Sequence, residues 1–544
     1  MPIRGRILSI GAALSLSIAL LPVGSATAAA PWNSGGVTVL EPVASDVGPS
    51  LSRSPRTGAA QDAAERVMEL KSNSGHGKPG GGGGGGSTDG ALQTSATLAP
   101  ATVAGNINRD GVGVGINGTY KDCCTPPDTN LAVGTTQVVQ WVNVDFAVFD
   151  KTTGALLSGP QKGNTIWSGF QVSACATNND GDPIVKFDAQ NQRWLMTQFS
   201  VSTQPYLQCV AISSSADFLN SSWYRYAYNF GTEFPDYPKV GIWPDAYYFS
   251  MNLFHNGATF SGADACALDS ASARAGLPNA SMQCINSGSA SLLPADLDGA
   301  TGATATTQLP PAGAAGYFMS LGSNALNLWR MHVNFADSTQ TTLTGPTSFA
   351  TAAFSQACGG GTCVPQAGTS QTLDTLADRL MYRLSYRNFG GYESLVVNHS
   401  AKGSGTSAPR WYELRNTGAG YAIAQQSSYA PDTTYRWMGS AAQDKQGNLA
   451  IGYSASSGTI SPDIRYAGRL ASDPAGQLRQ EVAVGLPTRG SETGPYSRWG
   501  DYSSMTLDPS DDCTFWYTTM YYKATGGSFT WSTRMVNFKF SGCS

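Results

Sequence analysis

The sequence is poor in charged side chains. Asp, Glu, Lys and Arg make up 13% of the 544 residues, about half the share of an average soluble protein, and the formal net charge is −4. A nucleic-acid-binding protein would carry a strongly basic patch, so this composition argues against a nucleic-acid partner. Glycine, serine, threonine, asparagine and aromatic residues replace the charges, which is typical of short strands joined by tight turns.

Histidine is also scarce, and two hydrolase motifs are missing. The sequence contains no HExxH motif and no GxSxG motif, which argues against a zinc enzyme and against an α/β-hydrolase-type serine enzyme. The four histidines are scattered: His76, His255, His332 and His399. We expect His399, which follows a predicted strand, to be a packing or surface residue.

Beyond residue 23 the chain has no long apolar run, so we predict a soluble mature protein without a membrane span. The N-terminus has the three parts of a secretory signal. Arg4 and Arg6 form a basic region, residues 7–23 are apolar and uncharged, and residues 26–28 are small. A membrane anchor is the alternative, but the apolar run is short for a span. We therefore predict a signal peptide over residues 1–28 and a secreted, extracellular protein.

All ten cysteines lie beyond residue 120, and an even number in an exported chain predicts disulfides. None forms a CxxC pair with the spacing of a metal site. Cys358 and Cys363 flank a loop of three glycines that could close on itself, and Cys513 and Cys543 could tie the last strands together. Pairing stays open for the remaining six, Cys123, Cys124, Cys175, Cys209, Cys266 and Cys284.

Residues 29–100 are predicted to form a disordered tail. The glycine run from Gly80 to Gly86 has the composition of a flexible linker, and only residues 62–70 suggest a short helix. A propeptide and a spacer are both consistent with this composition. We expect the folded domain to cover residues 101–544.

From about residue 101 onward, apolar residues alternate with a period of two and helical periodicity nearly vanishes. A self-similar unit recurs about every 55 to 65 residues, consisting of an apolar strand, a polar turn and a second, aromatic-rich strand. Residues 181–199 are a clear example, and residues 437–453 and 499–521 repeat the pattern. Seven units fit the chain if residues 292–335 form a weak one.

Each unit is a small antiparallel sheet that cannot bury both of its faces alone. Radial repetition buries these faces against neighbouring units and leaves only short edges. We therefore predict an all-β, seven-bladed β-propeller that is monomeric. A large β-sandwich or two stacked jelly rolls is the alternative, because regularly spaced short strands do not distinguish these architectures.

Four segments carry a resemblance to a known family. They are residues 126–130 (PPDTN), 179–183 (NDGDP), 378–383 (DRLMYR) and 498–503 (RWGDYS). In these segments the chain resembles secreted bacterial sialidase-like (BNR-type) propeller proteins, most of which have no established activity. The resemblance implies the fold more than a function. The Arg-Ile-Pro element and the intact Asp-boxes of true sialidases are missing.

The innermost strands of a propeller all begin close to one central axis. Residues at matching positions near these strand starts should therefore meet on one face of the molecule. These positions predict a ligand site formed by Asp128, Asp182, Tyr237, Arg379, Arg436, Trp437, Arg498, Trp499 and Asp501.

Three arginines from successive units, Arg379, Arg436 and Arg498, suggest the ligand of this site. Guanidinium groups bind carboxylates through two parallel hydrogen bonds. Sialidase-like enzymes hold a sugar carboxylate with such a triad, so the resemblance implies an acidic extracellular glycan. Trp437 and Trp499 could stack on sugar rings or belong to the core. The alternative is an inner ring of structural ion pairs in which aspartates neutralise the arginines.

Hydrolysis of a glycosidic bond needs two carboxyl-type groups, or a tyrosine nucleophile in some sialidases. Glu492 and Tyr496 lie in the loop before Arg498, where the glutamate could activate the tyrosine. Asp182 or Asp128 could then act as the acid. An exposed turn with a packed tyrosine is the simpler interpretation of this loop.

Residues 178–182 (NNDGD) are rich in the oxygen ligands that Ca²⁺ prefers, with Asp180 and Asp182 as the carboxylates. Their spacing is not that of an EF-hand, and an Asx-turn is the simpler explanation. A calcium site at these two residues is therefore one hypothesis.

Two functions remain open at this point. One is a glycoside hydrolase of sialidase-like type that acts on an acidic polysaccharide or glycoconjugate. The other is a non-catalytic propeller that binds glycan or protein at the cell surface. The guanidinium groups distinguish them, since an open cleft favours the first and arginines sealed against carboxylates favour the second.

Overall fold

The computed structural model describes Met1 and residues 36–53, 66–67, 89–118, 120–121, 123–289, 291–299 and 308–544. Most regular structure in these residues is β-strand. Their α-helices are two five-residue segments, α1 (Ser173–Thr177) and α2 (Ser270–Arg274). A bilayer-spanning helix is not found within the described ranges, where every helix is too short. The all-β prediction is confirmed.

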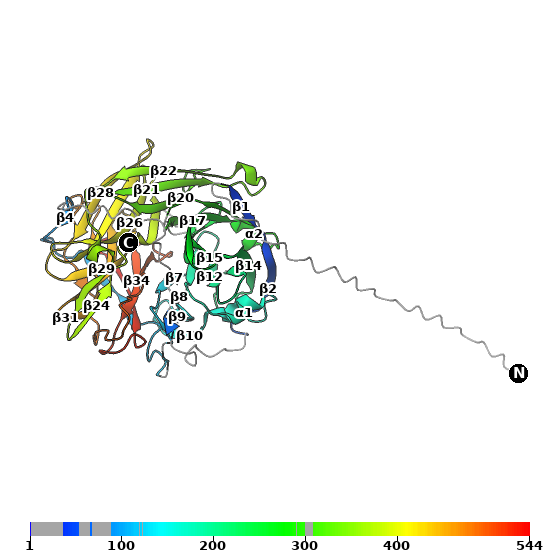
Figure 1. Cartoon of the computed structure of the whole chain (residues 1–544), viewed down its shortest axis with the longest axis horizontal. Helices are drawn as coiled ribbons and strands as arrows, with labels where there is room; N and C mark the ends of the chain where they lie inside the picture. Colours follow the sequence, from blue (N-terminus) through cyan, green and yellow to red (C-terminus); the bar gives the residue numbers. More distant parts are fainter. Residues whose placement is uncertain are drawn as a thin grey trace.

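The first three sheets follow the order of the chain (Figure 1). The first contains β7 (Asn130–Val133), β8 (Gln137–Val142), β9 (Asp145–Asp150) and β10 (Leu156–Lys162). The second contains β11 (Ile184–Asp188), β12 (Arg193–Ser200), β13 (Tyr206–Ser213) and β14 (Trp223–Gly231). The third contains β15 (Glu233–Ile242), β16 (Tyr247–His255), β17 (Thr259–Leu268) and β18 (Met282–Asn286).

The next two groups of strands share one sheet, because their first strands pair in parallel. One group is β19 (Leu293–Leu297), β20 (Gly316–Gly322), β21 (Ala325–His332) and β22 (Thr342–Ala350). The other is β25 (Met381–Asn388), β26 (Glu393–Lys402), β27 (Ser407–Asn416) and β28 (Tyr421–Tyr429). Between them lies a separate hairpin of β23 (Thr362–Gln366) and β24 (Thr369–Asp374).

Two further large sheets follow in the chain. The first contains β29 (Tyr435–Gln443), β30 (Leu449–Ser457), β31 (Ile460–Arg469) and β32 (Val482–Ala483). The second contains β33 (Ser504–Leu507), β34 (Thr514–Tyr521) and β35 (Ser532–Phe540), and its outer strand is β5 (Thr102–Asp110) from the other end of the domain.

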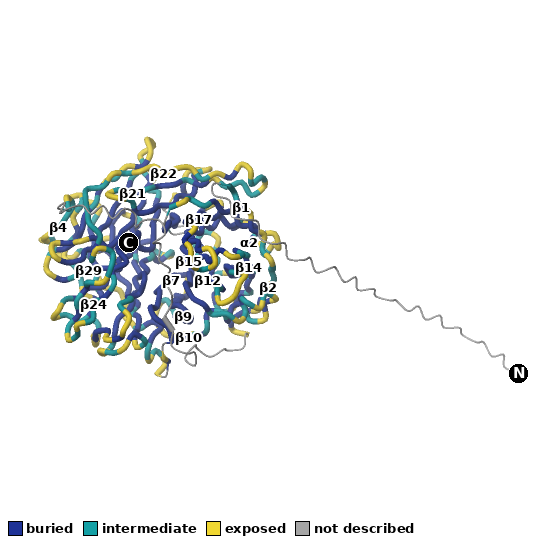
Figure 2. Tube along the Cα trace, in the orientation of Figure 1, coloured by how far each residue is buried: buried dark blue, intermediate teal, exposed yellow. Residues whose placement is uncertain are grey.

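The first strands of these groups form a closed ring. Contacts run from β7 through β11, β15, β19, β25, β29 and β33, and β33 contacts β7 again. These strands are mostly buried around the centre of the molecule, whereas exposed residues lie at its periphery (Figure 2). Sheets arranged radially around such a ring make a β-propeller.

In most groups one residue has the same backbone conformation, either just before the innermost strand or, for Tyr237 in β15 and Met438 in β29, at a register shift within it. The residue there has a positive φ angle, between 42° and 55°, which non-glycine residues rarely adopt. These residues are Asp128, Asp182, Tyr237, Ser291, Met438 and Asp501. Three aspartates and one tyrosine of the predicted site therefore share this backbone conformation.

Part of the predicted tail belongs to the fold. β1 (Val37–Leu40) pairs with β18, β2 (Pro42–Gly48) with β14, and β4 (Leu92–Gln93) with β28. For these residues the prediction of a disordered tail is wrong, because pairing with a sheet edge supplies the backbone hydrogen bonds that the composition does not reveal.

Other predictions for the N-terminal region have different outcomes. Residues 66–67 form β3 (Arg66–Val67), which pairs with β6 (Cys124–Thr125), so the helix predicted over residues 62–70 is wrong at these two positions. The glycine run at 80–86 and the signal peptide, apart from Met1, lie outside the described residues.

All ten cysteines are paired. The two predicted disulfides, Cys358–Cys363 and Cys513–Cys543, are confirmed. The others are Cys123–Cys124, Cys175–Cys209 and Cys266–Cys284. Five disulfides are consistent with an extracellular protein.

Candidate ligand site on the propeller axis

Three carboxyl groups gather where the innermost strands begin. Asp128 precedes β7, Asp182 precedes β11 and Asp501 precedes β33. The negative charge of Asp501 acts to raise the pKa of both Asp128 and Asp182. Their residues are 2%, 6% and 2% exposed, respectively. Because all three aspartates stand just before innermost strands, side chains that are far apart in sequence lie at one end of the axis.

Lys239 lies next to these carboxyls and was not predicted. Its side chain is fully buried, its Nζ donates a hydrogen bond to the Pro238 carbonyl at 2.9 Å, and Nζ lies 3.5 Å from the centre of the Tyr237 ring. Burial lowers the pKa of Lys239 to about 8, although Asp182 and Asp128 oppose this effect. A register shift in β15 between Asp236 and Lys239 interrupts the strand alternation on which a sequence-based prediction depends.

Asp128 and Asp182 differ in acidity. Burial, followed by the nearby charges of Asp501 and Asp182, raises the pKa of Asp128 well above its ordinary value. Burial also raises the pKa of Asp182, but the Lys239 ammonium limits that rise to about 6. Asp128 therefore holds its proton more strongly than Asp182 does.

The two carboxyls also differ in hydrogen bonding. The Tyr237 N–H donates to Oδ2 of Asp182 at 3.1 Å. Oδ1 of Asp128 has no hydrogen-bond partner among the described residues, although it is buried. A buried polar atom of this kind is a candidate for contact with a ligand or a water molecule.

The three predicted arginines are each paired with carboxylates. Arg379 donates two hydrogen bonds to Asp378, both at 2.9 Å, and Arg498 makes a bidentate pair with Asp501. These pairs favour the interpretation of the three arginines as structural ion pairs over their interpretation as a triad that is free to bind a sugar carboxylate.

Arg436 has carboxylate partners of its own. Its guanidinium donates to Glu481 at 2.8 and 2.9 Å and to Asp432 at 3.0 Å, within its own sheet region. Its partner Glu481 lies 45 residues away, so this pairing could not be predicted from spacing.

The predicted stacking residues Trp437 and Trp499 are core residues. Both are almost completely buried, and their ring centres are 5.8 Å apart. Nε1 of Trp499 donates to the Ser454 hydroxyl at 3.0 Å. Neither ring presents a face on which a sugar could stack.

Glu492 and Tyr496 have separate environments. Glu492 is fully buried, accepts a hydrogen bond from Ser528 at 2.6 Å, and has a pKa raised by burial to about 8. Tyr496 is 38% exposed and packs edge-on against Phe529. This arrangement does not support a tyrosine nucleophile activated by Glu492.

Asp180 is hydrogen-bonded to the loop that follows β12. Its carboxylate accepts hydrogen bonds from the Val201 N–H and from the N–H and hydroxyl of Ser202, at 2.5 to 2.8 Å. Asp182 instead faces Tyr237. The two predicted calcium ligands thus serve different partners, and the bonds of Asp180 to Val201 and Ser202 are not those of an Asx-turn.

The described ranges contain one cluster with metal-ligand spacing, formed by Asp264, Cys266 and Cys284. Its two cysteines are joined in a disulfide and offer no thiolate. The donor set therefore does not suit a metal ion.

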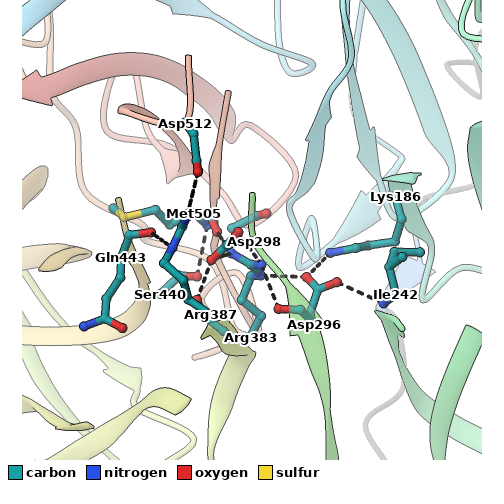
Figure 3. Close-up of polar contacts among 12 residues, drawn as sticks. Lys186, Ile242, Asp296, Asp298, Arg383, Arg387, Ser440, Gln443, Met505 and Asp512 are labelled. Atoms are coloured by element: carbon teal, nitrogen blue, oxygen red, sulfur yellow. Dashed lines mark hydrogen bonds and ion pairs between the residues drawn. The ribbon is translucent and has the colours of Figure 1, made fainter. Parts of the chain in front are cut away.

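A layer of tyrosines separates the acidic end of the axis from a second charged layer. Tyr237, Tyr382 and Tyr502 pack together, and the Tyr382 hydroxyl accepts a hydrogen bond from Lys186 Nζ at 3.1 Å. Lys186 also forms an ion pair with Asp296 (Figure 3).

Arg383 completes this second layer. It donates to Asp296 at 2.7 Å and, through both terminal nitrogens, to Asp298 at 2.7 and 3.1 Å (Figure 3). Two cations and two carboxylates therefore balance one another. A hollow of about 430 Å³, which includes open solvent, is lined by these four residues. The charged groups of this hollow therefore satisfy one another.

No protein-family model and no curated protein matches this chain. Solved structures with some likeness include an exo-1,5-α-L-arabinanase from a bovine ruminal metagenomic library (10% identity, 68% of this chain, 100% of that chain, TM-score 0.26). Others are a Trypanosoma rangeli sialidase (10%, 66%, 54%, TM-score 0.28) and a Fusarium graminearum α-L-arabinofuranosidase (9%, 83%, 99%, TM-score 0.33). Likenesses at these TM-scores carry no functional argument.

Proposed function

We propose that this protein is a secreted, seven-bladed β-propeller that binds an extracellular glycan at the axial site and hydrolyses it. The signal pattern in residues 1–28 and the five disulfides support export. The closed ring of innermost strands from β7 to β33 supports a count of seven blades. The domain covers residues 101–544 and is completed by strands from residues 37–93.

The unequal acidity of two neighbouring carboxyls carries this proposal. Cleavage of a glycosidic bond needs one protonated and one ionised carboxyl group. Asp128 would donate its proton to the glycosidic oxygen as the C–O bond breaks. Asp182 would attack the anomeric carbon or take a proton from the attacking water, and the separation of the carboxyls in the complex decides which.

The ion pairs at the rim of the axial site, Arg379–Asp378 and Arg498–Asp501, favour an uncharged glycan. Arg379 and Arg498 already bind carboxylates, so a sugar carboxylate would have to displace Asp378 or Asp501. The Asp378 side chain is 29% exposed and that of Arg498 is 17% exposed, so each pair can offer acceptors or donors to sugar hydroxyls. This revises the acidic glycan expected from the arginine triad.

A binding propeller without catalysis is the second candidate. It is favoured by the low exposure of Asp128 and Asp182, 2% and 6%, and by the pairing of the arginines. Binding at the rim would then involve no contact with the two carboxyls.

A glycan screen separates these candidates. The purified protein is tested on neutral and acidic polysaccharides for binding by calorimetry and for release of reducing ends, together with Asp128→Asn and Asp182→Asn. Asp432→Asn, which alters an exposed partner of Arg436, is the control. We expect turnover of a neutral glycan that falls about 100-fold or more in both axial variants and not in the control.

Other results have definite meanings. Binding without turnover by the wild type selects the second candidate. Absence of binding to every glycan overturns both, and turnover confined to acidic glycans contradicts the uncharged substrate.

A further inference from the structure

The turn between β8 and β9 contacts the loop that carries Asp128. The Asn143 N–H donates to the Pro127 carbonyl at 2.8 Å, and its side-chain Nδ2 donates to the Pro126 carbonyl at 2.6 Å. These are the two residues immediately before Asp128. The turn therefore fixes the backbone that delivers this carboxyl to the axis.

The same turn contacts the loop that carries Asp182. Oδ1 of Asn143 accepts a hydrogen bond from the Asp182 N–H at 2.9 Å. The neighbouring Val144 carbonyl accepts another from Nδ2 of Asn179 at 2.7 Å. The side-chain amide of Asn143, a residue that is only 1% exposed, thus joins the two loops directly.

The Cys123–Cys124 disulfide supports the arrangement from the other side. Both cysteines are buried and cluster with Val144. Nε1 of Trp531 donates to the Cys124 carbonyl at 2.8 Å. The Asp128 loop is therefore held at its start by the bridged pair and at its end by Asn143.

We infer that Asn143 is a positioning residue that holds the Asp128 and Asp182 loops in one fixed relation, with the Cys123–Cys124 bridge as its second support. The effect of Asn143 on catalysis rests on the proposed function, whereas its role in holding the two loops together does not.

The chemistry of an amide explains why asparagine occupies this place. Asn143 must donate to one loop and accept from the other, and a side-chain amide does both. Alanine removes both bonds. Aspartate keeps the acceptor for the Asp182 N–H, loses the donor to Pro126, and adds a negative charge close to two carboxyls.

We expect Asn143→Ala to let the two loops separate, because both side-chain hydrogen bonds are lost. The pKa of the Asp128 carboxyl should change with that separation. Several ionisable groups act on Asp128 or Asp182: Lys239 from β15, Arg498 and Asp501 before β33, and the hydroxyls of Tyr237 and Tyr502. Asp236 from β15 acts in turn on Lys239. Movement of the Asp128 loop away from these neighbours and toward water lowers the pKa of its carboxyl toward the ordinary range.

The test measures titration as well as activity. The carboxyl C=O band is followed against pH by infrared spectroscopy of aspartate-labelled protein, and Asp128→Asn identifies the contribution of Asp128. Asn143→Ala, Asn143→Asp and the double variant Cys123→Ser/Cys124→Ser are compared with Asn191→Ala. Asn191 is a turn asparagine whose side chain bonds within its own turn, to Asp188.

We expect the Asp128 band in Asn143→Ala to titrate at lower pH than in the wild type, with a smaller shift in the same direction in the cysteine variant and none in Asn191→Ala. If the wild type hydrolyses a glycan, kcat of Asn143→Ala falls about 100-fold with KM changed by less than about three-fold.

Unchanged titration in a folded Asn143→Ala protein overturns the inference. If that variant does not fold, the cysteine variant decides, and an unshifted Asp128 band there overturns it. A wild type inactive on every glycan removes the proposed hydrolysis, while the titration still tests the role of Asn143.

Discussion

Asp89 forms a 2.5 Å ion pair with Arg410, whose side chain is fully buried. Asp89 lies three residues before β4 and also accepts a hydrogen bond from the Ser428 hydroxyl at 2.6 Å. The pair therefore anchors the N-terminal segment to the sheet of β25–β28. A buried guanidinium that loses its carboxylate retains its desolvation cost without the compensating charge.

Asp89→Asn should accordingly lower the free energy of unfolding by about 3 kcal/mol. Chemical denaturation monitored by tryptophan fluorescence measures the change. Asp432→Asn, whose carboxylate is half exposed and shares Arg436 with Glu481, should change stability by less than about 1 kcal/mol. Equal effects of the two substitutions would mean that the N-terminal segment contributes little to the fold.

Removal of residues 1–53 should produce a protein that self-associates. β1 and β2 cover the outer edges of two sheets, formed by β18 and β14. Uncovered strand edges pair with other chains. Deletion also removes Asp46, the bidentate partner of the buried Arg225. Size-exclusion chromatography with light scattering should detect dimers or larger species, and a monomer with unchanged thermal stability would contradict this role.

Glu492→Gln should stabilise the protein near neutral pH. In the folded state burial raises the pKa of Glu492 to about 8, from 4.5 in the unfolded chain. Between these pH values the unfolded chain releases the proton and the folded protein retains it, so folding stability decreases as pH rises from about 4.5 to about 8. Glutamine has no such proton, and at pH 7 it should increase the free energy of unfolding by about 2 kcal/mol.

The difference in the free energy of unfolding between the wild type and Glu492→Gln should depend on pH, and this dependence is the specific readout. Thermal unfolding of both proteins between pH 4 and pH 9 should show the two curves approaching each other toward acidic pH, because Glu492 is then protonated in both states. A difference that stays constant over this range would assign the effect to packing around Ser528 instead.

Sequence periodicity predicted that Asp128, Asp182 and Asp501 stand close to the starts of innermost strands, and the structure has them just before β7, β11 and β33. It did not predict the partner of Arg436, which is Glu481 in a distant segment. It also failed for β1, which is a strand only because an open edge of β18 receives it. Repeats predict backbone positions, whereas side-chain partners and edge pairing depend on contacts that have no fixed spacing.

Lys239 illustrates the same limit and yields the last prediction. Its ammonium lies between the rings of Tyr237 and Tyr502, 3.5 and 4.1 Å from their centres, and stabilises the ionised form of Asp182. Lys239→Met removes that charge while keeping an unbranched apolar stem, so the pKa of Asp182 should rise above its present value of about 6. The acidic limb of the pH–rate profile, or the Asp182 carboxyl band where no turnover is found, should move to higher pH. Lys445→Met, in the turn between β29 and β30, should leave it in place. If Lys239→Met titrates like the wild type, Asp182 owes its acidity to Arg498 and the Tyr237 N–H rather than to the buried lysine.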